Sequence, residues 1–356
     1  MKEPSETVSE SVKYLGQGFL LAYYLPALVF VLAHLYVLIP ASIRSLRLPQ
    51  PAANKLTLPL LGDIDLSAWV DSLLWSLLVG IALFVLNTVL IRSFEGKPRW
   101  LKDGLLSRLT RRNQKECKNL YGRLASLQKK YFEFSSQSPQ ASSQETLLES
   151  LKLEIENEHK KIEEAKPQQT LPHSVERVCP TAFGNAYAIA EEYPYEHYGA
   201  DSVLFWPHLR ALMFAKAADH SLRLTQQKTV LDLSINFAFL SGLITVETIL
   251  LLVFSGDKPL LLVFAGVTFI LALCFYQASV AAIQGLGGLI KVSFDYYRGL
   301  VLQAFNLRMP DNLSEEQTVW VKLAAFIRRG DAFYFPEAYR EPKSGNGGIE
   351  ATKKDQ

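Results

Sequence analysis

Long apolar runs alternate with polar segments along this chain, and the runs have the length that a membrane span needs. A helix requires about 20 predominantly apolar residues to cross the hydrocarbon core of a bilayer. Only the four residues SGDK separate the last two runs, so we expect those two helices to form an antiparallel hairpin. The pattern predicts an all-α integral membrane protein with four transmembrane helices, at residues 19–39, 68–91, 233–254 and 259–283.

The first run is predicted to be a retained helix. Its apolar core is longer than the roughly 7–15 residues of a signal-peptide h-region. Pro26 lies inside the run, where we expect it to kink the helix.

Basic residues predict the orientation of the four spans. Loops rich in Lys and Arg stay in the cytoplasm, whereas the loop at 40–67 carries only Arg44, Arg47 and Lys55. We therefore expect this loop to be external, and the N-terminus (1–18), the C-terminus and the insert at 92–232 to be cytoplasmic. The basic set that follows the second span is Arg92, Lys97, Arg99, Lys102, Arg108, Arg111, Arg112 and Lys115.

The cytoplasmic insert is predicted to be a helical domain between the second and third spans. Leucines at helical spacing predict a helical hairpin at 100–166 around the low-complexity linker 135–144. The hairpin is either a short coiled coil or a solvated pair of helices that only spaces other parts. An aromatic subdomain follows at 180–214, where Thr181 and Asp201 can cap helices.

The C-terminal part is predicted to leave the membrane and to form cytoplasmic amphipathic helices over 284–342. Gly285, Gly287 and Gly288 are expected to make a hinge at the exit. Ser314 with Gln317 is expected to be a capping box for a helix that Gly330 ends. The tail at 343–356 is predicted to be disordered.

Composition and charge exclude several classes of function. Hydrophobic residues make up 49% of the 356 residues and charged residues 20%, and the mean hydropathy is +0.10. The net charge of +2 gives no reason to expect a nucleic-acid partner. The three cysteines form no CxxC pair, which argues against a disulfide framework or a zinc site. No HExxH, GxSxG or P-loop motif is present, so we expect neither an enzyme nor a cofactor.

One string of residues resembles a known family. It reads GN, then YPYxxYGxD, then WPxL, and it covers about a tenth of the 356 residues. It is similar to a motif of uncharacterised polytopic inner-membrane proteins of bacteria, and this resemblance implies a bacterial inner membrane but no activity. The residues that carry it are Gly184, Asn185, Tyr193, Pro194, Tyr195, Tyr198, Gly199, Asp201, Trp206, Pro207 and Leu209.

The stretch 191–209 allows three interpretations. Its aromatic residues Tyr193, Tyr195, Tyr198 and Trp206 could form an interfacial belt or a docking surface, or simply the core of a small helical domain. A metal site is the third, although the spacing matches no known ligand pattern. The sequence leaves lipid, protein and metal open as its partner. The residues of ligand type are Glu191, Glu196, His197, Asp201 and His208.

Polar residues recur at matched depths inside the predicted spans. His34, Asp71 and Glu247 fall in the outer third, where they could form a buried histidine–carboxylate cluster. A second layer near the inner side consists of Asn87, Asn236 and Gln277. These side chains either form a polar path, with Glu247 as ion ligand, proton carrier or gate, or only join helices by hydrogen bonds.

Small residues at four-residue spacing predict close contacts between helices. Such faces let two backbones approach each other within one chain or between two copies. They comprise Ser234, Ala238 and Gly242 in the third span, and Ala278 with Ala282 and Ala281 with Gly285 in the fourth.

The sequence favours a homo-oligomeric, channel-like or membrane-permeabilising protein that its cytoplasmic domain gates. The alternative is a non-enzymatic scaffold or signalling anchor that recruits a cytosolic protein through residues 100–228. A transporter is a further alternative, weakened because no inverted repeat is visible. Replacing Glu247 by Gln separates the first two, because a scaffold should tolerate the change.

Overall fold

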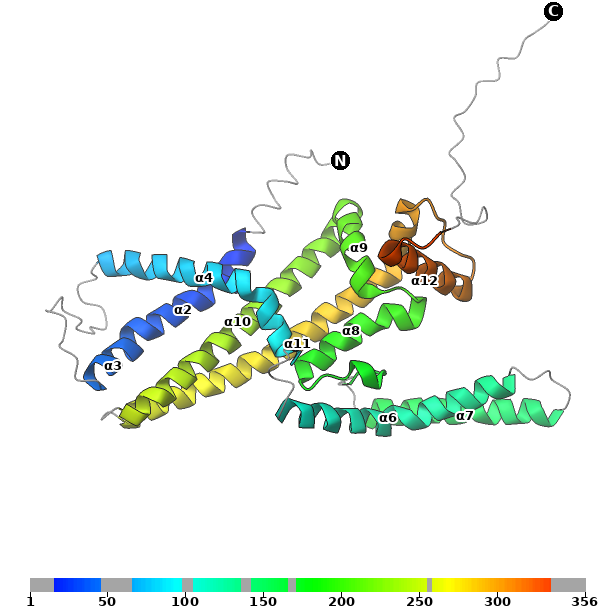
Figure 1. The fold of residues 1–356 in the computed structure, drawn as a ribbon, viewed down its shortest axis with the longest axis horizontal. Coiled ribbons are helices and arrows are strands. Elements are labelled where there is room, and N and C mark those ends of the chain that lie inside the picture. The colour runs from blue at the N-terminus through cyan, green and yellow to red at the C-terminus, as the bar shows by residue number, and fades with distance from the viewer. Residues whose placement is uncertain are drawn as a thin grey trace, which may run out of the picture. The chain divides into compact units, whose positions relative to one another are not determined.

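The computed structural model describes residues 16–45, 66–97, 105–135, 142–165, 171–254 and 258–333. These ranges are helical and contain no strand, so the predicted all-α fold is confirmed (Figure 1). Most of the predicted N-terminus and external loop, the middle of the linker, and the tail lie outside them. Four helices are long and apolar enough to cross a membrane, which makes the chain a multi-pass membrane protein; they are Gly16–Ile43, Val70–Phe94, Ala218–Val253 and Pro259–Ala304.

The chain divides into two compact units. Unit 1 comprises Met1–Ile189 and Leu224–Gly287, and unit 2 comprises Ala190–Arg223 and Gly288–Gln356. Each unit is described by itself below.

Two wide turns interrupt the first span of unit 1. The π-helices η1 (Leu20–Tyr24) and η2 (His34–Leu38) flank α2 (Leu25–Ala33), and α3 (Ile39–Ser45) follows. Each π-helix ends two residues before a proline, Pro26 or Pro40. Proline has no N–H, and its ring clashes with the carbonyl four residues earlier. The helix therefore widens by one residue before each proline. The kink at Pro26 stays a prediction.

Helix α4 (Leu66–Phe94) packs against the first span at a glycine. A Cβ atom on Gly80 would lie 3.4 Å from the Cα atom of Tyr24. One turn later the ring of Phe84 meets Tyr23 edge-on, with 5.4 Å between the ring centroids. The glycine and the aromatic pair together bring the two helices close.

Helices α10 (Ala218–Phe254) and α11 (Lys258–Ala304) run antiparallel within unit 1. Successive contacts along α10 meet α11 in reverse order: Gln227 with Ala282, Phe237 with Phe275 and Thr245 with Thr268. The predicted spans 233–254 and 259–283 are thus parts of longer helices. The glycines predicted to form a hinge do not break α11, although the boundary between the units falls at Gly287 and Gly288.

Helices α6 (Leu105–Ser135) and α7 (Ser142–Ala165) lie side by side as a hairpin (Figure 1). Arg123 of α6 pairs with Glu158 of α7, whereas Tyr131, further along α6, meets Lys152, earlier in α7. The two helices are therefore antiparallel.

Unit 2 is built from the end of α8 (Ala182–Tyr198), α9 (Ser202–Lys216), α12 (Leu313–Arg329) and the outer parts of α10 and α11. Asp201 caps α9 by accepting from the N–H of Leu204 at 3.0 Å. The predicted capping box at Ser314 is wrong, because Asn312 is the residue that caps α12. Gly330 ends this helix in the left-handed conformation, with φ of 69°. The core of the unit includes the fully buried side chains of Phe205, Leu209, Met213, Phe294 and Trp320.

Candidate functional site

Ionisable side chains join the first span to α10 along one line of contact, which we call the polar seam. At one end, His34 in η2 lies 2.7 Å from Glu247 of α10, measured from Nε2 to Oε2. The other ring nitrogen of His34, Nδ1, lies 2.9 Å from the carbonyl oxygen of Phe30. The structure thus brings together two members of the predicted outer layer.

Both ring nitrogens of His34 lie within hydrogen-bond distance of a partner. The carbonyl oxygen of Phe30 can only accept, which assigns a hydrogen to Nδ1 of His34. Nε2 then faces the carboxyl group of Glu247, 2.7 Å away.

At the other end of the seam, Tyr23 in η1 donates its hydroxyl to Asp232 of α10 over 2.8 Å. Lys228, one turn earlier on α10, donates to the other oxygen of the same carboxylate. Asp232 is buried, and these two donors compensate for the loss of water around its charge.

A side chain of α10 also repairs the backbone defect that Pro26 creates. In a regular helix the carbonyl of Ala22 would accept from residue 26, but Pro26 has no N–H. The amide nitrogen of Asn236 donates to the Ala22 carbonyl instead, over 2.7 Å. The side-chain oxygen of Asn236 is buried and has no hydrogen-bond partner among the described residues, and the same is true of Asn87 on α4.

The middle of the seam is apolar. Between the two polar ends the first span buries Ala27 and Val31, and α10 buries Leu240 and Ile244. The two polar ends are about 16 Å apart along the first span, at about 1.5 Å for each of the intervening residues. A tightly packed apolar section therefore separates them.

Two of the predicted polar residues, Asp71 and Gln277, do not join the seam. Asp71 is exposed on α4 and makes no hydrogen bond or ion pair with any described residue, so the predicted cluster of three is a pair in the structure. Gln277 is exposed on α11. Asn236 lies at the end of the seam near η1, where it binds the carbonyl of Ala22. Asn87 lies near the same end, because Phe84, one turn before it on α4, contacts Tyr23.

The predicted small-residue faces have different surroundings. Ser234 and Ala238 are buried, and a Cβ atom on Gly242 would meet nothing within 4 Å. The amide of Gln227 packs on Gly285 and donates to the carbonyl of Ala282 over 3.0 Å. Ala278 and Ala281, in contrast, are exposed.

In unit 2, two of the predicted aromatic residues converge on one carboxylate. Tyr198 donates to Asp295 of α11 over 2.7 Å and Tyr193 donates to it over 3.0 Å. The guanidinium of Arg298 lies 3.9 Å from the ring centroid of Tyr198 and also binds Glu316 of α12 over 2.6 Å. We call these five residues the tyrosine–aspartate cluster, and it ties α8, α11 and α12 together.

Burial and the carboxylate of Asp295 keep both hydroxyls protonated. Desolvation is the largest cause that raises the pKa of Tyr198, and the hydrogen bond to Asp295 raises it further. The pKa of Tyr193 is raised for the same two reasons in the same order. Both tyrosines are therefore hydrogen-bond donors at neutral pH rather than acids, which indicates a role in stability.

The remaining residues of the GN–YPY–WP string have packing or capping roles. The oxygen of Asn185 accepts from the N–H of Cys179 over 2.7 Å, and Gly199 ends α8 with φ of 70°. The ring of Trp206 stacks on Phe294, whereas Tyr195 is exposed. These contacts account for most of the string without any chemical activity.

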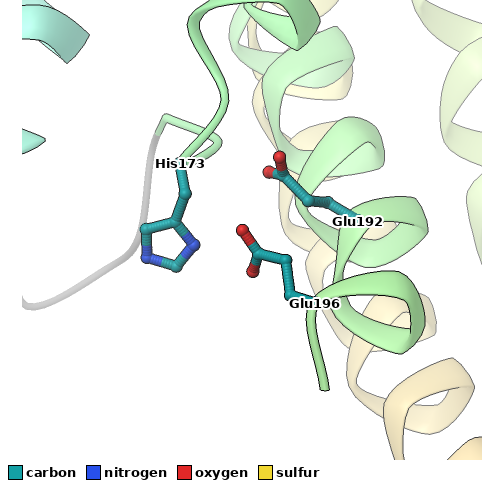
Figure 2. A group of neighbouring side chains, drawn as sticks. All are labelled: His173, Glu192 and Glu196. Atoms are coloured by element: carbon teal, nitrogen blue, oxygen red, sulfur yellow. The ribbon is translucent and has the colours of Figure 1, made fainter. Parts of the chain in front are cut away.

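The side chains of metal-ligand type do not form one set in unit 2. Asp201 caps α9 and pairs with Arg328, and His208 lies against Phe305. Glu192 and Glu196 are on successive turns of α8, with both carboxylates on the same side (Figure 2). His173, also labelled there, belongs to unit 1. Within unit 2, the two carboxylates supply too few ligands for a metal centre.

Sequence reasoning missed Tyr23, Lys228 and Asp232. Asp232 lies just before the apolar run of the third span, and Lys228 precedes it by one helical turn. That i, i+4 pair of opposite charges is a visible signal, but its partner Tyr23 is 209 residues away. Asp295, Arg298 and Glu316 were missed for the same reason.

Comparison of the chain with family models, with curated proteins and with solved structures gives no match. The candidate sites therefore rest on the geometry above.

Proposed function

We propose that this protein is a homo-oligomeric, channel-like protein of a bacterial inner membrane, and that its cytoplasmic domain gates it. The observation that carries the proposal is the His34–Glu247 pair inside the predicted spans, with 2.7 Å between the two side chains. Ionisable residues at membrane depth cost about 2.5–3.5 kcal/mol each on insertion scales and commonly mark ion pathways or proton relays.

The hydrogen bond between His34 and Glu247 suggests how the pair takes part in conduction. The bond holds the first span against α10. When the two helices separate at this point, the carboxyl oxygens of Glu247 become available to a cation or a proton. The buried amide oxygens of Asn87 and Asn236 offer acceptors to water or to a cation at the other end of the seam.

The π-helices supply a gating movement. Each contains one residue more than a regular turn, and π-turns occur frequently at functional sites. If η2 relaxed to a regular α-helix, the side chains on one side of it would rotate by about 100° relative to those on the other. His34 would then leave Glu247, and the apolar middle of the seam would repack.

An exposed stripe on α11 supports the oligomer. Gly266, Cys274, Gln277 and Ala281 are all exposed, and their spacing puts them on one face of the helix. Small residues let a second backbone approach closely, and Gln277 would gain a hydrogen-bond partner there. A second copy of this chain satisfies both requirements.

The proposed orientation follows from the basic residues after the second span. They favour a cytoplasmic position for residues 92–232 and for both termini. The resemblance of the GN–YPY–WP string favours a bacterial inner membrane.

The test is ion and proton flux through liposomes that contain the purified full-length protein. We expect the wild type to conduct and Glu247→Gln to conduct at least about tenfold less, because an amide can neither carry a negative charge nor relay a proton as a carboxyl group can. Asp71→Asn is the matched control, since Asp71 lies outside the seam and this change should leave flux unaltered. Equal flux in all three proteins would contradict a working role for the pair.

A membrane scaffold is the second candidate, and the α6–α7 hairpin favours it. Leu147 and Leu153 of α7 are exposed on a helix that is otherwise strongly charged, as a docking surface would require. The scaffold predicts no flux in any variant, together with a cytosolic protein that residues 100–228 retain on a column.

A further inference from the structure

Helix α6 has one continuous basic face. On a helix that turns about 100° per residue, all its Lys and Arg residues fall within an arc of about 140°. The opposite side buries Cys117, Leu124 and Leu127 against the rest of unit 1. The basic face, as we call it, comprises Arg108, Arg111, Arg112, Lys115, Lys118, Arg123, Lys129 and Lys130.

The acidic residues of α7 do not neutralise this face. Arg123 reaches Glu154 at 3.2 Å and Glu158 at 3.6 Å, and Lys129 lies 3.9 Å from Glu133 of its own helix. The five residues of the face nearest the second span are exposed, and none of them has a carboxylate partner in the described parts of the chain. These five are Arg108, Arg111, Arg112, Lys115 and Lys118.

The beginning of α6 is held close to the end of the second span. Only residues 95–104 separate Phe94 from Leu105, so the chain itself limits the distance. Thr181 donates to the carbonyl of Phe94 over 2.7 Å, and Asn113 of α6 donates to the carbonyl of Cys179 over 2.9 Å. The segment 171–184 thus ties α6 to the end of α4.

We propose that the basic face of α6 binds the headgroups of anionic phospholipids in the leaflet where the second span ends. Several Lys and Arg residues directly after a span attract such lipids, and their attraction extends over about one Debye length. Headgroups are the one anionic surface that the tether of α6 guarantees to be within reach. The proposal is independent of whether the protein conducts ions.

Orientation of the spans alone does not explain the basic face. The positive-inside rule counts charges within about 15–20 residues of a span end and does not require them to share a helical face. This face continues to Lys130, 36 residues after Phe94. Glu116 lies about 20° outside the edge of the face, and Glu133 is the first acidic residue on it. A continuous charged strip suits a planar surface of charges better than it suits an isolated ligand.

The experiment uses the full-length protein in nanodiscs of neutral phosphatidylcholine, with and without about 30% phosphatidylglycerol. A neutral amine-acetylating reagent labels lysines, and mass spectrometry follows the rate at each site. We expect Lys115 and Lys118 to react about fivefold more slowly in the anionic discs, and about 0.5 M NaCl to remove the difference. Lys160 of α7 is the control, because it lies on the other helix of the hairpin and should react equally in both discs.

A double variant, Arg108→Gln with Arg112→Gln, tests whether the face acts as a unit. Both residues are exposed, so the fold should persist. We expect the protection of Lys115 and Lys118 to fall by about half or more. Equal labelling in neutral and anionic discs would overturn the proposal. Protection in neutral discs that appears only when RNA is added would also overturn it, in favour of a nucleic-acid partner.

Discussion

The amide of Asn236 shows how a single residue can determine where two membrane helices meet. Pro26 leaves the carbonyl of Ala22 without its helical donor, and water is absent from the bilayer core to replace it. Asn236 supplies the donor from α10 over 2.7 Å. The proline thus leaves an unpaired carbonyl on an otherwise apolar span, and the side chain of Asn236 donates a hydrogen bond to it.

This account predicts that Pro26 and Asn236 are energetically coupled. Asn236→Ala should lower the free energy of unfolding by about 1–2 kcal/mol, because the Ala22 carbonyl loses its partner. In a Pro26→Ala background the helix can supply its own N–H, so the same change should cost about 1 kcal/mol less. Thermal or denaturant unfolding in detergent micelles gives the free energy of unfolding of the wild type, the two single variants and the double variant. Equal costs of Asn236→Ala in both backgrounds would contradict the coupling.

The tyrosine–aspartate cluster predicts a loss of stability at alkaline pH. The pKa of Tyr198 in the folded state lies above its ordinary value of 10.0, so its contribution is present below pH 10 and is lost as the pH rises through the folded pKa. Melting temperatures measured from pH 8 upward should therefore fall more steeply above about pH 10 in wild type than in a Tyr193→Phe/Tyr198→Phe double variant. Parallel curves of melting temperature against pH would show that the cluster does not cause the loss of stability. His197→Gln is the control, since His197 neighbours both rings but does not contact Asp295.

At the scale of the elements, the end of α4 and the start of α8 meet at a close junction. A Cβ atom on Gly184 would lie 2.6 Å from the carbonyl oxygen of Glu95 and 2.7 Å from the Cβ atom of Cys179. Gly96, just after α4, adopts a positive φ of 73° and lies against Pro180. Backbone therefore meets backbone here, which only glycine allows.

We predict that Gly184→Ala destabilises unit 1 by about 1–3 kcal/mol, because the atoms that it meets cannot move aside as a flexible side chain could. Gly122→Ala on α6 is the matched control, since a Cβ there meets nothing within 4 Å. It should instead stabilise the helix by about 0.5–1 kcal/mol. Thermal unfolding of both variants and of the wild type tests this prediction. A Gly184→Ala variant as stable as the wild type would show that the junction has room for a Cβ atom.

At the scale of the whole molecule, the number of spans determines which parts share a side of the membrane. With four spans, we predict that the two termini and the insert at 92–232 share one side of the membrane, and that the loop at 40–67 is on the other side. Single-cysteine variants without the native cysteines test this: Asn119→Cys and Lys343→Cys should react with an impermeant maleimide from one side, and Ala53→Cys from the other. Labelling of residues 119 and 343 from opposite sides would contradict the topology.

The sequence predicted what depends on local pattern and composition. The four apolar runs, the caps at Asp201 and Gly330, and the approach of His34 to Glu247 all follow from spacing or from matched depth. The length of α11 did not follow, because glycines break helices in water more readily than in a packed hairpin. Contacts across large sequence separations, such as Tyr23 with Asp232 or Arg298 with Glu316, leave no local signal.

The most direct test of the central claim is flux through liposomes by a protein in which the pair has been exchanged, His34→Glu with Glu247→His. The single changes His34→Glu and Glu247→His each leave two like groups facing each other, so we predict at least about a tenfold loss of flux in each. The exchanged pair can again form a histidine–carboxyl hydrogen bond across the same contact, and we predict that flux recovers to within about threefold of wild type. Flux that is the same in all four proteins, or absent in all, would contradict a conducting role for the seam.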